Sequence, residues 1–300
     1  MNIDLATIIF FDGLNYAATL FMLSVGLTVV FGVLRILNVS HGGIYALGAY
    51  MGTWLALWVL DVGLPPVLTY LALFVGALII GLTVGPIIER LLLRRIYGSD
   101  MHIQLLLTFS ILLILDDGMK LIWGMEPLFV SEPYAMLGTF SVGGILYPWY
   151  DSVLVAVSIM FGGALVWLVR GTRFGKLVVS VISDREISLA IGINVNRIFM
   201  VAFTVGAVAA ALGGAFIAPK IAVVPQFALE VIVLAFAVIA IGGMGSIEGA
   251  AAGAVIVSFA RALAIHLAPE FELVVIYLIM ILVLAFRPQG LFGEVELRRI

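Results

Sequence analysis

Charged residues are scarce in this sequence, and cysteine is absent from it. Only 11% of the 300 residues are charged, 64% are hydrophobic, and the mean hydropathy is +1.25. A soluble domain averages about 45–50% apolar and about 25% charged residues, and a soluble chain of this length could not bury so much apolar surface. We therefore expect a polytopic membrane protein. The lack of cysteine excludes disulfides and thiolate metal sites.

Basic residues are missing from the start of the chain. No Lys or Arg precedes Arg35, whereas Asp4 and Asp12 both lie in this stretch. A cleavable signal peptide has a basic leading segment. We therefore expect the first apolar run to be retained as a membrane span.

Long apolar runs make up most of the chain. A spanning helix needs about 20 apolar residues, because backbone groups in lipid must bond within their own segment. The runs are continuous rather than alternating, which disfavours a β-barrel. The sequence predicts an all-α bundle of about 8–10 transmembrane helices in one domain, with two pseudo-repeat halves (about 1–170 and 198–300) joined by a loop at 171–197. The candidate spans are 14–34, 43–60, 67–89, 103–123, 152–170, 198–218, 227–245, 248–267 and 271–286.

Most basic residues lie in three segments of the sequence. If the chain crosses the membrane nine times, all three segments lie on the same side. They are Arg90, Arg94 and Arg95; Arg170, Arg173, Lys176, Arg185 and Arg197; and Arg287, Arg298 and Arg299. The loop 124–150 has no Lys or Arg. The positive-inside bias predicts cytoplasmic basic segments and C-terminus, with loop 124–150 and the N-terminus outside.

The loop 170–197 contains a predicted short helix at about 184–191. Ser183 and Glu186 have the spacing of a capping box, and Gly192 is a plausible stop. Ile187, Ala190 and Ile191 share one face at i, i+3, i+4 spacing. Such a helix either rests on lipid or on its own bundle, or docks on a cytoplasmic partner.

Two glycine-rich stretches, ILNVSHGGIYALGAY (36–50) and IGGMGSIEGAAAGAV (241–255), lie at corresponding places in the two halves and are predicted broken helices. Broken helices in such places commonly mark a transport site. Glycines spaced like Gly249 and Gly253 also allow close helix packing. For 38–50 we favour a broken helix, because Asn38, Ser40 and His41 could bond freed backbone groups or a polar solute.

Asp116 and Asp117 lie within the fourth span, with Lys120 four and three residues later. Acidic groups at membrane depth can form a proton relay. The alternative, which we favour, is a carboxylate–lysine pair near the outer boundary, with Lys120 reaching to the interface. Arg261 near the outer end of its span has the same snorkelling interpretation.

No catalytic or metal-binding constellation is present in the sequence. His41, His102 and His266 are scattered and lack the spacing of metal ligands. The segment GTRFGKL (171–177) has three residues between its glycines instead of four, and Leu177 where a nucleotide-binding loop has Ser or Thr. We therefore expect no enzyme activity, no metal and no cofactor bound by this chain.

Four segments of the sequence together match the pattern of a known transport family. They are residues 11–50, the loop 184–197, GGMGSIEGAAAGA (242–254) and FRPQGLFG (286–293). The first block contains Gly-Leu, then Gly-Leu-Thr, then Asn-x-x-His-Gly and Leu-Gly-Ala-Tyr. The chain resembles the permeases of high-affinity branched-chain amino acid ABC importers, most closely the shorter of their two paired types; urea and amide importer permeases are similar. It departs from their pattern at Glu248, where proline is frequent, and at Asp116 and Asp117, where uncharged amides are more usual. An acidic pair there would favour a cationic or amide solute.

The resemblance implies a subunit of a larger transport machine in a bacterial or archaeal cytoplasmic (inner) membrane. Its implied partners are a second permease, forming a heterodimer, two cytoplasmic ATP-binding subunits and a periplasmic or surface solute-binding protein, and no nucleic acid. The solute would be a branched-chain amino acid or a related small polar solute. The predicted coupling residues are Asp184, Arg185, Glu186, Ala190, Gly192 and Ile193. The predicted path residues are Asn38, Ser40, His41, Gly42, Gly43, Tyr45, Gly48, Gly242, Gly243, Gly245 and Ser246. The alternative is an ion-coupled secondary transporter in which Asp116 and Asp117 carry protons.

Overall fold

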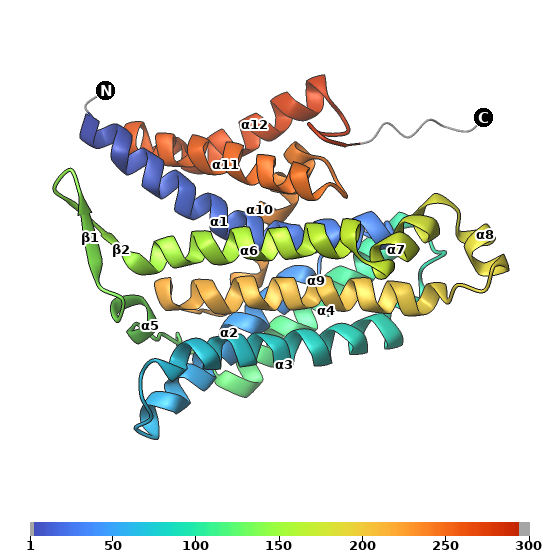
Figure 1. Ribbon diagram of the computed structural model, residues 1–300, viewed down its shortest axis with the longest axis horizontal. Helices are drawn as coiled ribbons and strands as arrows, with labels where there is room; N and C mark the ends of the chain where they lie inside the picture. Colours follow the sequence, from blue (N-terminus) through green and yellow to red (C-terminus); the bar gives the residue numbers. More distant parts are fainter. Residues whose placement is uncertain (1–2, 294–300) are drawn as a thin grey trace.

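The computed structural model describes residues 3–293 as a helical bundle (Figure 1). Arg298 and Arg299 of the predicted basic tail lie outside the described residues. The α-helices are α1 (Ile3–Leu34), α2 (His41–Asp61), α3 (Leu68–Leu91), α4 (Met101–Trp123), α5 (Glu132–Ala135), α6 (Trp149–Gly171), α7 (Arg173–Ser183), α8 (Arg185–Ala190), α9 (Val195–Ile217), α10 (Phe227–Gly242), α11 (Ile247–Leu267) and α12 (Glu272–Phe286). Short 3-10 turns are η1 (Leu93–Arg95), η2 (Ala218–Lys220) and η3 (Pro269–Phe271), and one hairpin is formed by β1 (Thr139–Val142) and β2 (Ile145–Pro148).

Each of the nine predicted spans coincides with one helix. Within the described residues, seven helical segments are long and apolar enough to cross a membrane: Asp4–Leu34, His41–Asp61, Leu68–Arg95, Trp149–Gly171, Val195–Lys220, Ile247–Leu267 and Pro269–Phe286. The other two predicted spans correspond to α4 and to the apolar but shorter α10. The 16 residues of α10 rise only about 24 Å, less than the hydrocarbon core of about 30 Å. The protein is therefore a multi-pass helical membrane protein.

The two ends of the bundle differ. The hairpin and α5 lie at one end, and α8 projects from the other (Figure 1). The basic residues of η1, α7 and α8 belong to the α8 end, whereas the loop 124–150, which lacks Lys and Arg, forms the hairpin end. This separation of charge agrees with the sidedness that the positive-inside bias predicts.

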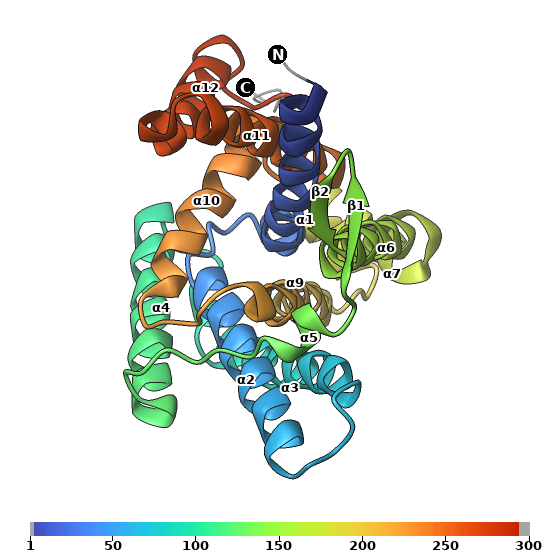
Figure 2. The same cartoon turned by 90° about the vertical axis from the view of Figure 1, so that its left-hand side faces the viewer.

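The core lies where α1, α2, α3 and α9 pack together. The inner helices are rich in alanine and glycine, which let helix backbones approach closely in a membrane. In contrast, only 6% of the apolar segment Pro269–Phe286, which includes α12, is buried. Viewed from the hairpin end, α11 and α12 lie on the opposite side of the molecule from α2 and α3 (Figure 2).

The hairpin was not expected from the sequence. Thr139 pairs with Pro148 and Val142 with Ile145. The turn glycines Gly143 and Gly144 have φ of 62° and 84°, as a two-residue hairpin turn of type I′ requires.

Candidate functional site

The first predicted interruption is present between α1 and α2. The backbone is non-helical from Arg35 to Ser40, and α2 begins at His41. The His41 ring donates through Nε2 to the carbonyl oxygen of Leu23, 3.0 Å away. Leu23 lies eleven residues before the end of α1, which corresponds to about 16 Å of helix. The chain therefore turns back into the bundle before α2 starts.

This interruption is packed inside protein. Asn38, Ser40 and His41 are fully buried. The Thr108 hydroxyl donates to the carbonyl oxygen of Leu37 at 3.1 Å, and Ser40 Oγ donates to Asn38 Oδ1 at 2.6 Å. Non-helical backbone at membrane depth is tolerated only where protein or a water-filled cavity covers it. The predicted broken helix is thus confirmed, while a role of these side chains in a solute path stays a prediction.

The glycines that follow allow α2 to approach its neighbours. A Cβ at Gly48 would collide with the carbonyl oxygen of Ala211 in α9, and one at Gly42 would collide with that of Ala228 in α10. A Cβ at Gly43 would lie 2.8 Å from a methyl group of Leu115 in α4. These positions therefore bring three helices against the first half of α2.

The second predicted interruption is also present, between α10 and α11. Gly243 ends α10 with φ of 111°, Gly245 has φ of 88°, and the Ser246 hydroxyl caps α11 by accepting from the Gly249 amide at 2.9 Å. A Cβ at Gly242 would collide with the carbonyl oxygen of Gly249. In this turn the small residues serve close packing of two helices.

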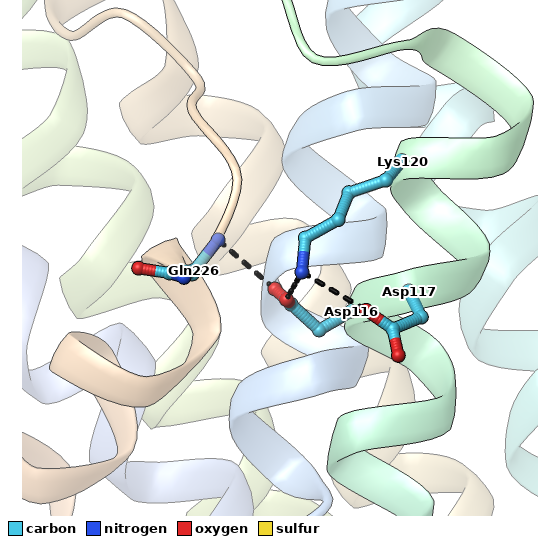
Figure 3. A network of polar contacts seen from close by, with 4 residues as sticks. All are labelled: Asp116, Asp117, Lys120 and Gln226. Carbon is cyan, nitrogen blue, oxygen red and sulfur yellow. Dashed lines mark hydrogen bonds and ion pairs between the residues drawn. The ribbon is translucent and has the colours of Figure 1, made fainter.

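The break between the predicted spans 198–218 and 227–245 is present at 221–226, but its contact with Asp116 was not predicted. Gln226 immediately precedes α10 with φ of 70°, and its backbone amide donates to Asp116 Oδ1 at 3.0 Å (Figure 3). Lys120 Nζ lies 2.7 Å from Asp116 Oδ2 and 2.9 Å from Asp117 Oδ1. The favoured carboxylate–lysine pair is present, and Asp116 additionally fixes the start of α10.

A cavity of about 440 Å³ lies between α1, α9, α10 and α11, toward the hairpin end. Its walls include Tyr45 of the predicted path and the apolar side chains of Leu20, Leu23, Phe227, Val231 and Leu234. The second cavity, of about 320 Å³ between α1, α6 and α11, is lined almost entirely by apolar side chains. The larger cavity is therefore the better candidate site for a polar solute.

Charged groups of both signs line the larger cavity: Asp12, Asp151, Lys220, Glu230 and Arg261. Lys220 Nζ lies 2.7 Å from Asp151 Oδ1 and donates to Asn15 Oδ1 at 2.8 Å. His266 Nε2 lies 2.8 Å from Asp12 Oδ2. These pairs connect α1, α6, η2 and α11 around the cavity.

Arg261 pairs within the bundle, and its snorkelling interpretation stays a prediction. Its guanidinium pairs with Glu272 and lies 4.0 Å from the centre of the Tyr16 ring. The side chain is only 26% exposed. A carboxylate and an aromatic ring within the protein therefore stabilise this cation.

Sequence reasoning missed Asp12, Asn15, Asp151, Lys220 and Glu230 as site residues. One signal in the sequence could have indicated this site. Lys220 is an isolated cation just after the predicted span 198–218, whose end we expect on the outer side of the membrane. Such a cation needs a counter-charge. Its partners are far away in sequence, so only the folded structure identifies them.

The predicted coupling helix is present as α8, but its cap differs from the prediction. Ser183 is the last residue of α7, and the carboxylate of Asp184 caps α8 by accepting from the Ile187 amide at 2.9 Å. The capping-box assignment to Ser183 is therefore wrong by one residue, because the helix α7 extends to that position. Gly192 ends the segment with φ of 87°, as predicted.

The apolar side chains of this segment face outward. The exposed fractions are 60% for Ile187, 54% for Leu189 and 68% for Ile191, and Ala190 and Ile193 are also not buried. Ser188 alone is buried within α8, where its hydroxyl lies 3.1 Å from that of Ser180. The α8 segment thus presents apolar surface that residues 3–293 do not cover.

Arg185 connects α8 to the bundle. Its guanidinium carbon lies 5.6 Å from the centre of the Phe199 ring, which packs edge-on against Tyr97. The Tyr97 hydroxyl donates to the buried Glu89 at 2.6 Å, and burial together with this bond raises the pKa of Tyr97. Glu186 is exposed and has no ion-pair partner within residues 3–293. This arrangement links α8 to α9 and α3 and leaves Glu186 free for a partner.

Comparison with known proteins shows similarity to one group. A family model described as "Branched-chain amino acid transport system / permease component" matches residues 9–284. The chain is 28% identical to the high-affinity branched-chain amino acid transport system permease protein LivH of Escherichia coli (strain K12), over 97% of this chain and 96% of that protein. It is 27% identical to BraD of Pseudomonas aeruginosa, of the same printed description, over 96% of each chain. A probable branched-chain amino acid transport permease of Methanocaldococcus jannaschii is 25% identical over 93% of this chain and 90% of its own.

Proposed function

Because this chain belongs to the branched-chain amino acid transport system / permease component family, we propose that it is the membrane permease subunit of an ATP-binding-cassette importer. It carries branched-chain amino acids or a related small polar solute inward. It has no ATPase activity and binds no cofactor. ATP and Mg are held by two cytoplasmic ATP-binding subunits, and a second, homologous permease completes the membrane unit as a heterodimer.

The observation that supports this most directly is the apolar surface of α8. Ile187, Leu189 and Ile191 are each more than half exposed on a helix that projects from the end carrying the basic residues (Figure 1). Exposed apolar surface of this kind marks a contact with a partner or with a membrane. A cleft of the ATP-binding subunit would cover it, and ATP-driven movement of α8 would reach the bundle through Arg185 and Phe199. The chain then lies in the cytoplasmic (inner) membrane with its C-terminus in the cytoplasm.

The test is uptake into proteoliposomes that contain the chain with its partner permease and ATP-binding subunits. ATP is enclosed, and the solute-binding protein is supplied outside with labelled leucine, isoleucine, valine or urea. We expect ATP-dependent uptake of at least one of these solutes. Replacing Arg185 and Glu186 together with alanine should abolish uptake while the complex still assembles. Full uptake by this variant would contradict the coupling role.

Mutation of Asp116 distinguishes ATP-driven import from ion-coupled transport. In the structure Asp116 pairs with Lys120 and accepts a hydrogen bond from the Gln226 amide, so both carboxylate oxygens have partners. We expect Asp116→Asn to lower thermal stability but to retain ATP-dependent uptake. Uptake driven by a proton gradient in liposomes that contain only this chain, and its loss in Asp116→Asn, would support the ion-coupled function instead.

A further inference from the structure

Among the charged side chains that line the larger cavity, Glu230 differs from the others because it has no partner within residues 3–293. Lys220 pairs with Asp151, Arg261 with Glu272, and Asp12 with His266. Glu230 also lines the cavity, is exposed, and has no hydrogen-bond or ion-pair partner within residues 3–293. A carboxylate that has no partner of its own makes the cavity locally anionic.

Asn15 supplies a second unpaired group in the same cavity. It is only 8% exposed, and its Oδ1 accepts from Lys220. Its Nδ2 is buried and has no partner among the described residues. Leaving a buried amide donor without an acceptor is costly, so an acceptor supplied by a ligand would be favoured at this position.

The rest of the wall suits an alkyl group. Leu20, Leu23, Val231 and Leu234 line the cavity, and the Tyr45 and Phe227 rings lie 5.8 Å apart beside them. Small-molecule sites commonly combine such an apolar wall with a few polar groups that orient the ligand.

We propose that this cavity is the solute site of the permease, in which Glu230 binds a cationic group of the solute. The Asn15 amide, beside Lys220, binds an acceptor group such as a carboxylate, and the apolar wall holds the alkyl part between them. The assignment rests on the proposed transport function. It makes Glu230 a specificity-determining residue that disfavours solutes with only negative charge. A carboxylate in the first turn of α10 would also stabilise the helix dipole, but that effect gives no preference between solutes.

The absence of cysteine from the chain allows a direct test of the cavity's charge. Leu234 lies one helical turn after Glu230 and lines the same cavity. We would introduce Leu234→Cys into the full chain, assembled with its partners in nanodiscs without nucleotide. The rates of reaction with methanethiosulfonates carrying a trimethylammonium or a sulfonate group are followed by mass spectrometry of this chain.

We expect the cationic reagent to be favoured, and Glu230→Gln to lower the cation-to-anion rate ratio about fivefold, because one charge at about 8 Å acts oppositely on the two reagents. Glu270→Gln is the matched control, since Glu270 is also exposed but does not line the cavity. A ratio that Glu230→Gln leaves unchanged, or that Glu270→Gln changes equally, would overturn the proposal.

Protection of the same cysteine tests solute binding. Leucine should slow labelling most, isopentylamine less, and 4-methylpentanoate least, because the last lacks the ammonium group. Glu230→Gln should remove the protection by isopentylamine. Equal protection by the amine and the acid, or protection that Glu230→Gln does not alter, would overturn the assignment.

These measurements need no ATP hydrolysis, so they separate the two proposals. An unchanged rate ratio overturns the role of Glu230 even where ATP-driven uptake succeeds. Failed uptake with a shifted ratio and selective protection overturns the importer function and supports the cavity as a solute site.

Discussion

The helices α2 and α8 meet their surroundings in opposite ways. The first ten residues of α2 are all buried; their glycines pack against α4, α9 and α10, and His41 bonds α1. In α8 the apolar side chains point away from the bundle, and Ser188 is the only buried residue. The position of α2 is therefore determined within this chain. The apolar surface of α8 is uncovered within residues 3–293, and the two helices should respond differently to mutation.

The largest expected effect is on partner binding at α8. Replacing Ile187 and Ile191 with serine removes two exposed apolar side chains and should weaken binding of the ATP-binding subunit about 30-fold or more, as loss of interface hot spots does. The melting temperature should hardly change, because neither side chain packs in the core. Binding measured by biolayer interferometry on the nanodisc-embedded permease checks this. The control is Leu121→Ser with Ile122→Ser, because these apolar residues near the opposite end are even more exposed. Equal binding by both variants would remove the proposed contrast between α8 and the rest of the surface.

The next effect is on stability at α2. Gly48→Ala places a Cβ against the carbonyl oxygen of Ala211, and overpacking of this kind costs about 1–3 kcal/mol. We expect a clearly lower melting temperature by fluorescence-detected size exclusion. Gly118→Ala in α4 is the matched control, because no atom lies within 4 Å of its added Cβ. Equal melting temperatures for the two variants would show that α2 is less tightly enclosed than the structure indicates.

The smallest effect is on the cap of α8. Asp184→Ala removes the acceptor for the Ile187 amide, and loss of such a cap costs about 1 kcal/mol. Coupled ATPase activity should fall by no more than about fivefold. Asp184→Asn keeps a capping oxygen and should retain most of the activity. A larger loss in the Asn variant than in the Ala variant would show that charge, and not the cap, is what the partner requires.

Much of the fold could be predicted because lipid imposes a simple rule on apolar runs. The interruption before His41 was also visible, since Asn38, Ser40 and two glycines follow one another in an apolar context. The break at 221–226 was visible too, as the gap between two predicted spans, but its contact with Asp116 was not. Gln226 adopts a positive φ because its amide meets Asp116 across the bundle, and a local pattern cannot show that contact.

The candidate site was less predictable for the same reason. Asp12 and His266 are 254 positions apart, and Asn15 and Lys220 are 205 apart. Which charges pair, and which carboxylate stays unpaired, depends on how α1 packs against α11 and η2. The cap of α8 was misplaced by one residue because Ser183 and Asp184 are both good capping residues, and only the extent of α7 decides between them.

The most direct test of the α8 contact is cross-linking from a single introduced cysteine. We predict that Ile187→Cys in the assembled importer forms a maleimide-mediated cross-link to the ATP-binding subunit, whereas Leu146→Cys in the hairpin at the opposite end does not. In intact cells, Ile187→Cys should stay unlabelled by a membrane-impermeant maleimide added outside. Labelling of position 187 from outside, or a cross-link from position 146 in its place, would contradict the account.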